Sequence, residues 1–278
     1  MCRWLAYSGS PILLDELLYK PKHSLIDQSL HSRMGVETTN GDGFGVGWYT
    51  PDNGPMPTVF RAIGPAWNDQ NLRELAASIR SPLFLAHIRA STGTPVQQTN
   101  SHPFRYGDWL WIHNGALCDF PVIRRQLLLA VDPSLFNSIH GSTDSELMFH
   151  LALTFGLRDD PVAGVERMAG FVESVAARHG VADPVQMTIA TTDGRSVWVF
   201  RYSSRGDSRS LHFSTAVATL RAMYPDNETL HGVSDETRIV VSEPLGDLVG
   251  AWQPVPESSF GVIRDGTDEL GRFEPRKP

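Results

Sequence analysis

The chain has 278 residues, and 24 Lys and Arg against 31 Asp and Glu give it a formal net charge of −7 at neutral pH. Hydrophobic residues make up 41% and charged residues 20% of the chain, a composition that is ordinary for a soluble globular protein and excludes a disordered one. Nucleic-acid binding needs a clustered excess of Lys and Arg, so the acidic balance argues against a nucleic-acid partner. No apolar run reaches the roughly 18 residues that a membrane-spanning helix needs.

Strand and helix patterns alternate in blocks along the chain. Short apolar or alternating runs predict strands at Cys2–Ser8, Phe44–Tyr49, Leu83–Arg89 and Trp109–His113, and later at Val185–Thr192, Arg195–Tyr202, Leu211–Thr215, Arg238–Ser242 and Ser259–Ile263. Apolar residues at a spacing of three to four predict helices at Asn68–Arg80, Phe120–Val131, Asp144–Phe155 and Pro161–His179. Helices segregated from such strands indicate an α+β fold, and we expect a single domain over residues 1–278.

Local signals mark several boundaries. Thr143 to Glu146 has the pattern of a capping box at a helix start, in which Thr and Glu satisfy each other's backbone amides. Asp193-Gly194 predicts a hairpin with a type I′ turn. We expect residues 50–58 to form a loop, and the last dozen residues of the chain to be a frayed tail.

Cysteine is scarce, and its position is informative. Only Cys2 and Cys118 are present, and the start of the chain lacks the basic and apolar regions of a secretory signal, so we expect reduced thiols in the cytoplasm. Removal of the initiator Met would leave Cys2 with both a nucleophilic thiol and an α-amine able to accept its proton. The alternative is that Cys2 is a small buried hydrophobic residue.

Three further groups are candidates for chemistry. Asn114 and the amide of Gly115, in His113-Asn114-Gly115 at the end of a predicted strand, could hold an oxyanion, although Asn-Gly is also a common turn. Arg89, delivered by a strand to a loop that includes Thr92, could bind a carboxylate, or could simply end the strand at the surface. Asp144 could bind an ammonium group, or could serve only the helix dipole.

Two other site types are disfavoured by spacing. His87, His102 and His113 lack the spacing of a metal motif, and no Cys-x-x-Cys pair is present, so we expect no metal site. The glycine-rich stretch at 40–48 precedes a strand instead of opening a helix, which argues against a dinucleotide loop. We interpret it as backbone that packs closely beside another segment.

Together these segments resemble the class II (N-terminal nucleophile) glutamine amidotransferases. The matching segments are Met1-Cys2-Arg3 for the nucleophile, His87-Ile88-Arg89 for the glutamine carboxylate, His113-Asn114-Gly115 for the oxyanion, and Thr143-Asp144-Ser145-Glu146 for the α-amino group. The resemblance implies a four-layer αββα sandwich of two antiparallel sheets. It also implies that Cys2 attacks the side-chain carbonyl of glutamine or a γ-glutamyl amide to form a thioester, with no metal and no organic cofactor.

The acceptor or leaving group stays open at this point. The start of the chain, the glycine-rich stretch at 40–48 and Asn100–Phe104 are more similar to stand-alone members, including a branch that hydrolyses a γ-glutamyl amide in ergothioneine biosynthesis. A glutamine amidotransferase would pass ammonia to an acceptor, which could be a partner protein. The alternatives are a γ-glutamyl-amide hydrolase without an acceptor, an N-terminal-cysteine acylase, and a catalytically silent regulatory subunit.

Overall fold

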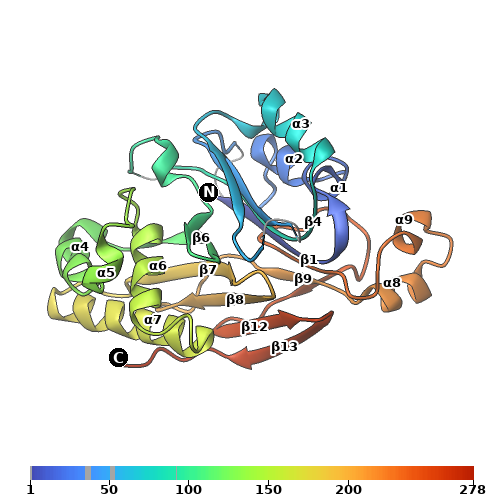
Figure 1. Cartoon of the computed structure of the whole chain (residues 1–278). Coiled ribbons are helices and arrows are strands. Elements are labelled where there is room, and N and C mark those ends of the chain that lie inside the picture. The colour runs from blue at the N-terminus through green and yellow to red at the C-terminus, as the bar shows by residue number, and fades with distance from the viewer. Residues whose placement is uncertain (1, 35–38, 51–53, 92) are drawn as a thin grey trace.

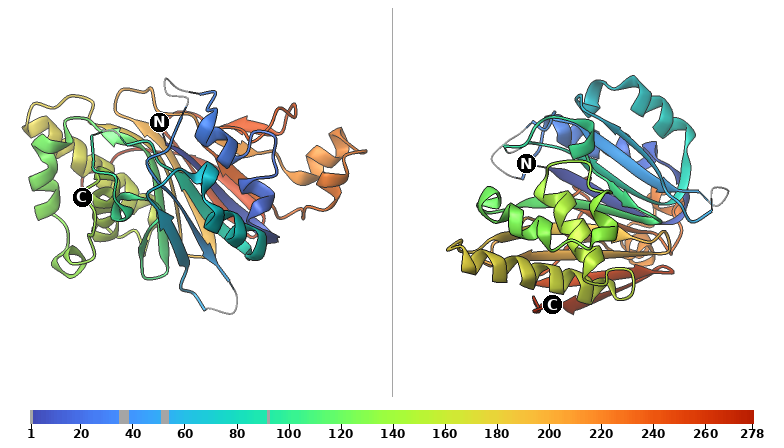
Figure 2. Two further views of the ribbon diagram at one scale, coloured as in Figure 1. Left: turned by 90° about the horizontal axis from the view of Figure 1, so that it is seen from above. Right: turned by 60° about the vertical axis from the view of Figure 1, so that its left-hand side comes forward.

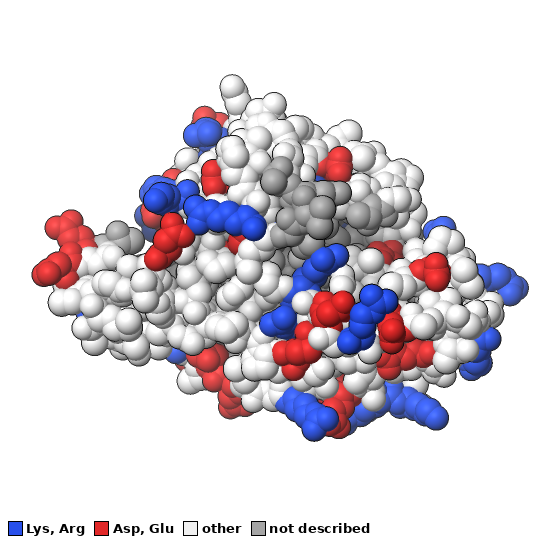
Figure 3. Space-filling model, turned by 180° about the vertical axis from the view of Figure 1, so that it is seen from behind, with Lys and Arg blue, Asp and Glu red and all other residues white. Residues whose placement is uncertain are grey.

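The computed structural model describes residues 2–34, 39–50, 54–91 and 93–278. Two antiparallel sheets lie face to face, and helices cover the outer face of each sheet (Figures 1 and 2). This four-layer αββα arrangement confirms the predicted α+β fold. No helix among the described residues is long and apolar enough to cross a membrane. On the face drawn in Figure 3, Lys and Arg side chains are interspersed with Asp and Glu.

Each sheet is assembled from strands that are distant in the sequence. The first sheet has the order β11-β9-β10-β1-β4-β2-β3, and the second has the order β13-β12-β8-β7-β6-β5. The first contains β1 (Arg3–Leu13), β2 (Phe44–Tyr49), β3 (Thr58–Ala62), β4 (Arg80–Ile88), β9 (His212–Ser214), β10 (Arg238–Val241) and β11 (Trp252–Pro254). The second contains β5 (Phe104–Tyr106), β6 (Trp109–Leu117), β7 (Val185–Thr192), β8 (Ser196–Ser203), β12 (Ser259–Arg264) and β13 (Thr267–Arg272).

The helices fall into three groups (Figure 1). The first sheet is covered by α1 (Asp15–Leu18), α2 (Leu25–Leu30) and α3 (Gln70–Ser78), and the second by α4 (Phe120–Leu129), α5 (Pro133–Phe136), α6 (Asp144–Thr154) and α7 (Pro161–Arg178). To the right of β9 in Figure 1 lie α8 (Val217–Met223) and α9 (Glu228–His231). Short 3₁₀ turns form at Ala66–Asn68 and Gln98–Asn100.

The alternation of side chains along β1 shows how the layers are held together. Trp4 and Ala6 lie between the two sheets, whereas Leu5 and Tyr7 lie against the helices that cover the first sheet. A third apolar cluster, which includes Trp111, fills the space between the second sheet and α4 to α7. A strand buried on both faces in this way has little freedom to change register.

Two histidines are buried between the sheets. The rings of His87, on β4, and His102 are stacked with their centroids 4.1 Å apart. His87 Nε2 donates to the carbonyl of His113 at 3.1 Å, whereas His102 has no hydrogen-bond partner for either ring nitrogen among the described residues. Burial lowers the pKa of His87 to about 3 and holds the pKa of His102 well below its usual value. Both rings are therefore neutral near pH 7.

Two of the local predictions need correction. Thr143 Oγ1 accepts from the backbone N–H of Glu146 at 3.1 Å, but the Glu146 carboxylate accepts from His140 and Gly141 instead, so only half of the capping box forms. The hairpin after Thr192 is present, but its turn is not type I′, because Gly194 has a positive φ and Asp193 does not.

The last dozen residues are not a frayed tail. Thr267–Arg272 forms β13, which pairs with β12 across a turn in which both Asp265 and Gly266 have positive φ, at 49° and 73°. Phe273 follows this strand and is buried against Phe200 and Tyr202. The expected loop at 50–58 also ends earlier, because Thr58 begins β3, and residues 51–53 lie outside the described residues.

The burial of Phe273 gives a direct test of this C-terminal structure. Replacing Phe273 with Ala should lower the free energy of unfolding by about 3–5 kcal/mol, because a large buried ring leaves a cavity. Leu270 is 54% exposed on β13, so Leu270→Ala should change it by less than about 0.5 kcal/mol. Urea denaturation measures both, and a small effect of Phe273→Ala would contradict this packing.

The neutral state of the buried histidines predicts how stability depends on pH. Below an unfolded-state pKa of about 6.5, the unfolded chain binds a proton that the folded chain excludes. Each such histidine therefore lowers stability by about 1.4 kcal/mol per pH unit as the pH falls toward the folded-state pKa. We expect His102→Phe to reduce this slope by up to about 1.4 kcal/mol per pH unit, measured by urea titrations between about pH 7 and 5. An unchanged slope would show that His102 binds its proton in the folded state as readily as in the unfolded state.

Candidate active site

The pairing of β1 with β4 brings Cys2 and Arg89 to the same place. The two strands are antiparallel with Arg3 opposite Ile88, and the next position of this register sets Cys2 opposite Arg89. The Cys2 sulfur is 3.4 Å from the backbone nitrogen of Ala90 and 3.5 Å from its carbonyl oxygen. The nucleophile candidate is thus held against the backbone immediately after the β4 strand.

The Cys2 thiol is protonated near neutral pH. Burial raises its pKa, although the hydrogen bond from Ala90 and the charge of Arg89 act in the opposite direction. The negative charge of Asp144 adds to the rise of this pKa. A thiol in this state needs a base to remove its proton during attack on a carbonyl carbon.

Arg89 is 3% exposed, and acceptors hold both terminal nitrogens of its guanidinium. Nη1 donates to the carbonyl of Asp42 at 3.2 Å, and Nη2 donates to the Thr94 hydroxyl at 2.7 Å and to the carbonyl of Pro95 at 3.2 Å. The Nε donor has no partner among the described residues. The planar group is therefore oriented, and it retains a donor for an anionic ligand.

Asn114 and Gly115 lie within β6, not in a turn at its end, because the strand continues to Leu117. Asn114 is opposite Thr188 of β7, and the Thr188 hydroxyl donates to the Asn114 carbonyl at 3.3 Å. The same hydroxyl accepts from Trp4 Nε1 at 3.1 Å, which connects this position to β1. The side-chain amide of Asn114 has no partner among the described residues and can bind a ligand.

Gly115 is required by close backbone approach. A Cβ at this position would lie 1.9 Å from the carbonyl oxygen of Gln186, a distance that no side chain could occupy. Gly45, in the part of the glycine-rich stretch that forms β2, also packs closely beside another segment, as predicted, because a Cβ there would lie 2.2 Å from the carbonyl oxygen of His102.

Asp144 connects the start of α6 to the end of β6. Its Oδ2 accepts from the backbone N–H of Leu117 at 2.8 Å, and its Oδ1 accepts from that of Ser145 at 2.8 Å. The Ser145 hydroxyl lies 2.7 Å from His113 Nδ1, so the helix start is fixed to two positions of the strand. A half-buried carboxylate accepts up to about four hydrogen bonds, which leaves capacity for an ammonium group.

The candidate residues thus lie at one end of the two facing sheets: Cys2, Arg89, Asn114, Gly115 and Asp144. β1 begins beside β6 (Figure 1). Thr92 lies outside the described residues.

The sequence did not predict that Asp42 and Thr94 orient Arg89, because nothing in their local pattern indicates a contact with its guanidinium. No group of three or more His, Cys, Asp or Glu among the described residues is placed to hold a metal ion.

Comparison with known proteins identifies the family. Residues 20–276 match the family described as class-II glutamine amidotransferases. The protein named "Probable glutamine amidotransferase DUG3" from Saccharomyces cerevisiae is 36% identical over 96% of this chain and 83% of its own length. The γ-glutamyl-hercynylcysteine sulfoxide hydrolase of Mycolicibacterium smegmatis is 35% identical over 95% of this chain and 96% of its own length.

Solved structures agree with this match. A glutamine aminotransferase class-II domain protein from Silicibacter pomeroyi superposes with a TM-score of 0.75 at 29% identity, covering 99% of this chain and 100% of that one. The glutamine phosphoribosylpyrophosphate amidotransferase of B. subtilis shares the fold, with a TM-score of 0.62 at 16% identity over 99% of this chain and 50% of its own. The chain belongs to the class II glutamine amidotransferase family.

Proposed function

We propose that this chain cleaves the side-chain amide of glutamine or of a γ-glutamyl amide, with Cys2 as the nucleophile. The observation that carries the proposal is the register of β1 and β4, which sets a thiol beside an oriented guanidinium. Asn114, Gly115 and Asp144 on the facing sheet and its helix complete the set of groups that an amino acid with a cleavable side-chain amide needs.

The reaction begins with attack of the Cys2 sulfur on the amide carbonyl carbon. With Met1 removed, the α-amine of Cys2 takes the thiol proton, because its reference pKa of about 7.7–8.0 lies near working pH. The side-chain amide of Asn114 and the Gly115 N–H hold the oxyanion of the tetrahedral intermediate. Transfer of the proton to the leaving nitrogen expels ammonia or an amine and leaves a thioester, and attack by water then releases glutamate and restores the thiol.

The substrate is held at both of its α groups. Arg89 binds the α-carboxylate through the Nε donor that its fixed guanidinium retains, and Asp144 binds the α-ammonium group. Thr92 is proposed as a further substrate contact beside Arg89. Arg89 follows β4 of the first sheet, and Asp144 begins α6, which covers the second sheet. Binding at both anchors orients the side-chain amide toward Cys2 before reaction.

The fate of the leaving nitrogen separates the remaining alternatives. A relative that covers nearly all of this chain is named as a γ-glutamyl-hercynylcysteine sulfoxide hydrolase, which favours a γ-glutamyl amide as substrate and water as the only acceptor. A second possibility is that ammonia from glutamine passes to a partner protein. Glutamate release from a panel of glutamine and γ-glutamyl amides distinguishes the two.

We also propose a cytoplasmic location for the chain. Its two free cysteines fit a reducing compartment.

An electrophilic glutamine analogue such as diazo-oxo-norleucine tests the nucleophile. It keeps both α groups, so it should alkylate Cys2, and excess glutamine should slow the labelling. Cys118, which is exposed, serves as the internal control because it has no free α-amine. Cys2→Ala should lose both labelling and glutamate release. Peptide mapping that finds the label only on Cys118 would contradict the proposal.

Substrate binding and chemistry should separate in two variants. Arg89→Lys should raise KM more than it lowers kcat, because the carboxylate carries the same charge in the ground and transition states and a point charge cannot replace the planar group. Asn114→Ala should instead lower kcat by about 10²–10³ with a smaller change in KM, because it removes an oxyanion donor. Steady-state kinetics measure both variants at a temperature at which each is fully folded. A fall in kcat for Arg89→Lys with a rise in KM for Asn114→Ala would contradict these two assignments.

A further inference from the structure

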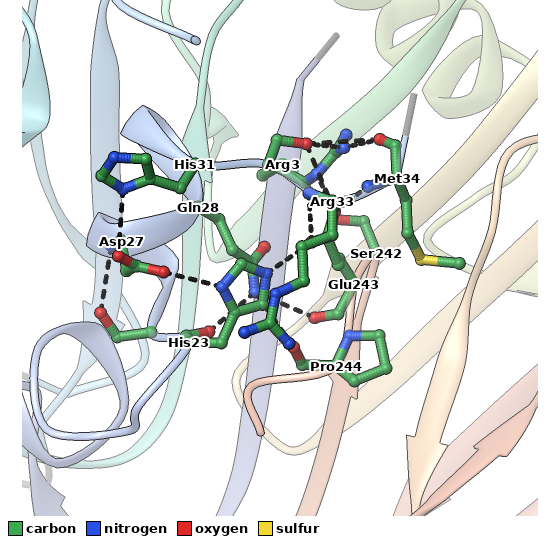
Figure 4. A network of polar contacts seen from close by, with 12 residues as sticks. Arg3, His23, Asp27, Gln28, His31, Arg33, Met34, Ser242, Glu243 and Pro244 are labelled. Atoms are coloured by element: carbon green, nitrogen blue, oxygen red, sulfur yellow. Dashed lines mark hydrogen bonds and ion pairs between the residues drawn. The ribbon is translucent and has the colours of Figure 1, made fainter. Parts of the chain in front are cut away.

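A buried carboxylate that pairs with Arg3, the residue after the proposed nucleophile, takes no part in the mechanism described so far. Glu243 follows β10, is 2% exposed, and lies at the centre of the polar network in Figure 4. Its Oε1 accepts from His23 Nε2 at 2.5 Å and from the backbone N–H of Arg33 at 2.9 Å. Its Oε2 accepts from Arg3 Nε at 2.8 Å and from the backbone N–H of Met34 at 3.1 Å.

Arg3 connects this carboxylate to Cys2. The Arg3 side chain is 2% exposed, and its Nη1 donates to the carbonyl oxygen of Cys2 at 2.9 Å. The Nη2 group contacts the Ser32 hydroxyl and the Met34 carbonyl, so every part of the guanidinium is held. The planar group therefore joins the backbone of the proposed nucleophile to the Glu243 carboxylate.

The Glu243 carboxylate is ionised, because donors surround both of its oxygens. Burial alone would raise the pKa of Glu243, but the hydrogen bonds from His23 and the Arg33 backbone, together with the charge of Arg3, lower it. His23 also contacts Asp27 through Nδ1 at 2.7 Å, so each of its ring nitrogens faces a carboxylate. Every described partner of the two Glu243 oxygens donates to them, and an amide NH₂ in place of either oxygen would face donors only.

We infer that Glu243 is a positioning residue, which fixes the backbone of Cys2 through Arg3 and so sets the direction of attack of the sulfur. This inference rests on the proposed role of Cys2. The strand two residues after Cys2 is already fixed, because Trp4 N–H donates to the Ser242 hydroxyl at 2.9 Å and Ser242 N–H donates to the Trp4 carbonyl at 3.1 Å. The Arg3–Glu243 pair extends this attachment of β1 to β10 up to Cys2 itself.

Glu243→Gln is the test, with Glu166→Gln as its matched control. Glu166, on α7, is 1% exposed, accepts from the backbone N–H of Glu274 at 3.1 Å and pairs with Arg276 at 2.7 Å, but it lies in the helix layer beyond the second sheet. Both changes remove a buried carboxylate and should lower the midpoint of urea unfolding. Only Glu243→Gln should lower kcat, by about 10²-fold, because a displacement near 1 Å has an effect of that order.

The rate of alkylation by diazo-oxo-norleucine separates positioning from loss of folded protein. Partial unfolding lowers the amount of Cys2 that is labelled but leaves the rate constant of the folded fraction unchanged. Misplacement of Cys2 lowers the rate constant itself, and it should fall in Glu243→Gln by about the same factor as kcat. KM for glutamine should change by less than about twofold, because Arg89 and Asp144 are untouched.

Arg3→Lys provides a second variant if Glu243→Gln is too unstable to assay. A lysine keeps the charge but cannot reach both Glu243 and the Cys2 carbonyl, so the same fall in the rate constant is expected. The double variant should be no slower than either single variant, since both act through one connection. Equal rate constants for Glu243→Gln and Glu166→Gln, with normal labelling of the wild-type chain, would overturn this inference alone. A wild-type chain that is not labelled at Cys2 would overturn the proposed function as well.

Discussion

The antiparallel pairing of β1 with β4 is the constraint on which the rest of the site depends. Strand pairing with both faces buried allows one register, and here that register sets Cys2 opposite Arg89. A slip by one residue would exchange Trp4 and Leu5 between the inter-sheet core and the helix-facing core, and would disrupt the packing of both cores. The energy of the core therefore holds the spacing between a thiol and a guanidinium to the accuracy that chemistry requires.

The second sheet contributes its groups through hydrogen bonds that cross between the layers. Trp4 binds Thr188, which binds the carbonyl of Asn114, and His87 binds the carbonyl of His113. These bonds span the two sheets at the positions beside the proposed oxyanion donors. Because the donors and acceptors are buried, breaking any of them leaves an unsatisfied polar group, and this cost keeps the two halves of the site in place.

Much of this could be predicted from the sequence, and the failures have physical causes. Short apolar runs identified strands such as Phe44–Tyr49 correctly, because every residue of that strand is buried. Asn114-Gly115 has the composition of a turn, but tertiary pairing with β7 overrides that tendency. Asp265-Gly266, not Asp193-Gly194, forms the turn with two positive φ angles. The Arg3–Glu243 contact joins residues 240 positions apart, and no local pattern contains it.

Trapping the acyl-enzyme is the most direct test of the central claim that Cys2 attacks a γ-glutamyl carbonyl. The purified chain is mixed with glutamine or a γ-glutamyl amide, quenched in acid within the first turnover, and digested for mass spectrometry. The account predicts that the peptide containing Cys2 gains the mass of one glutamyl group and loses it on treatment with hydroxylamine, as a thioester does. A glutamyl group attached to any other side chain would contradict it.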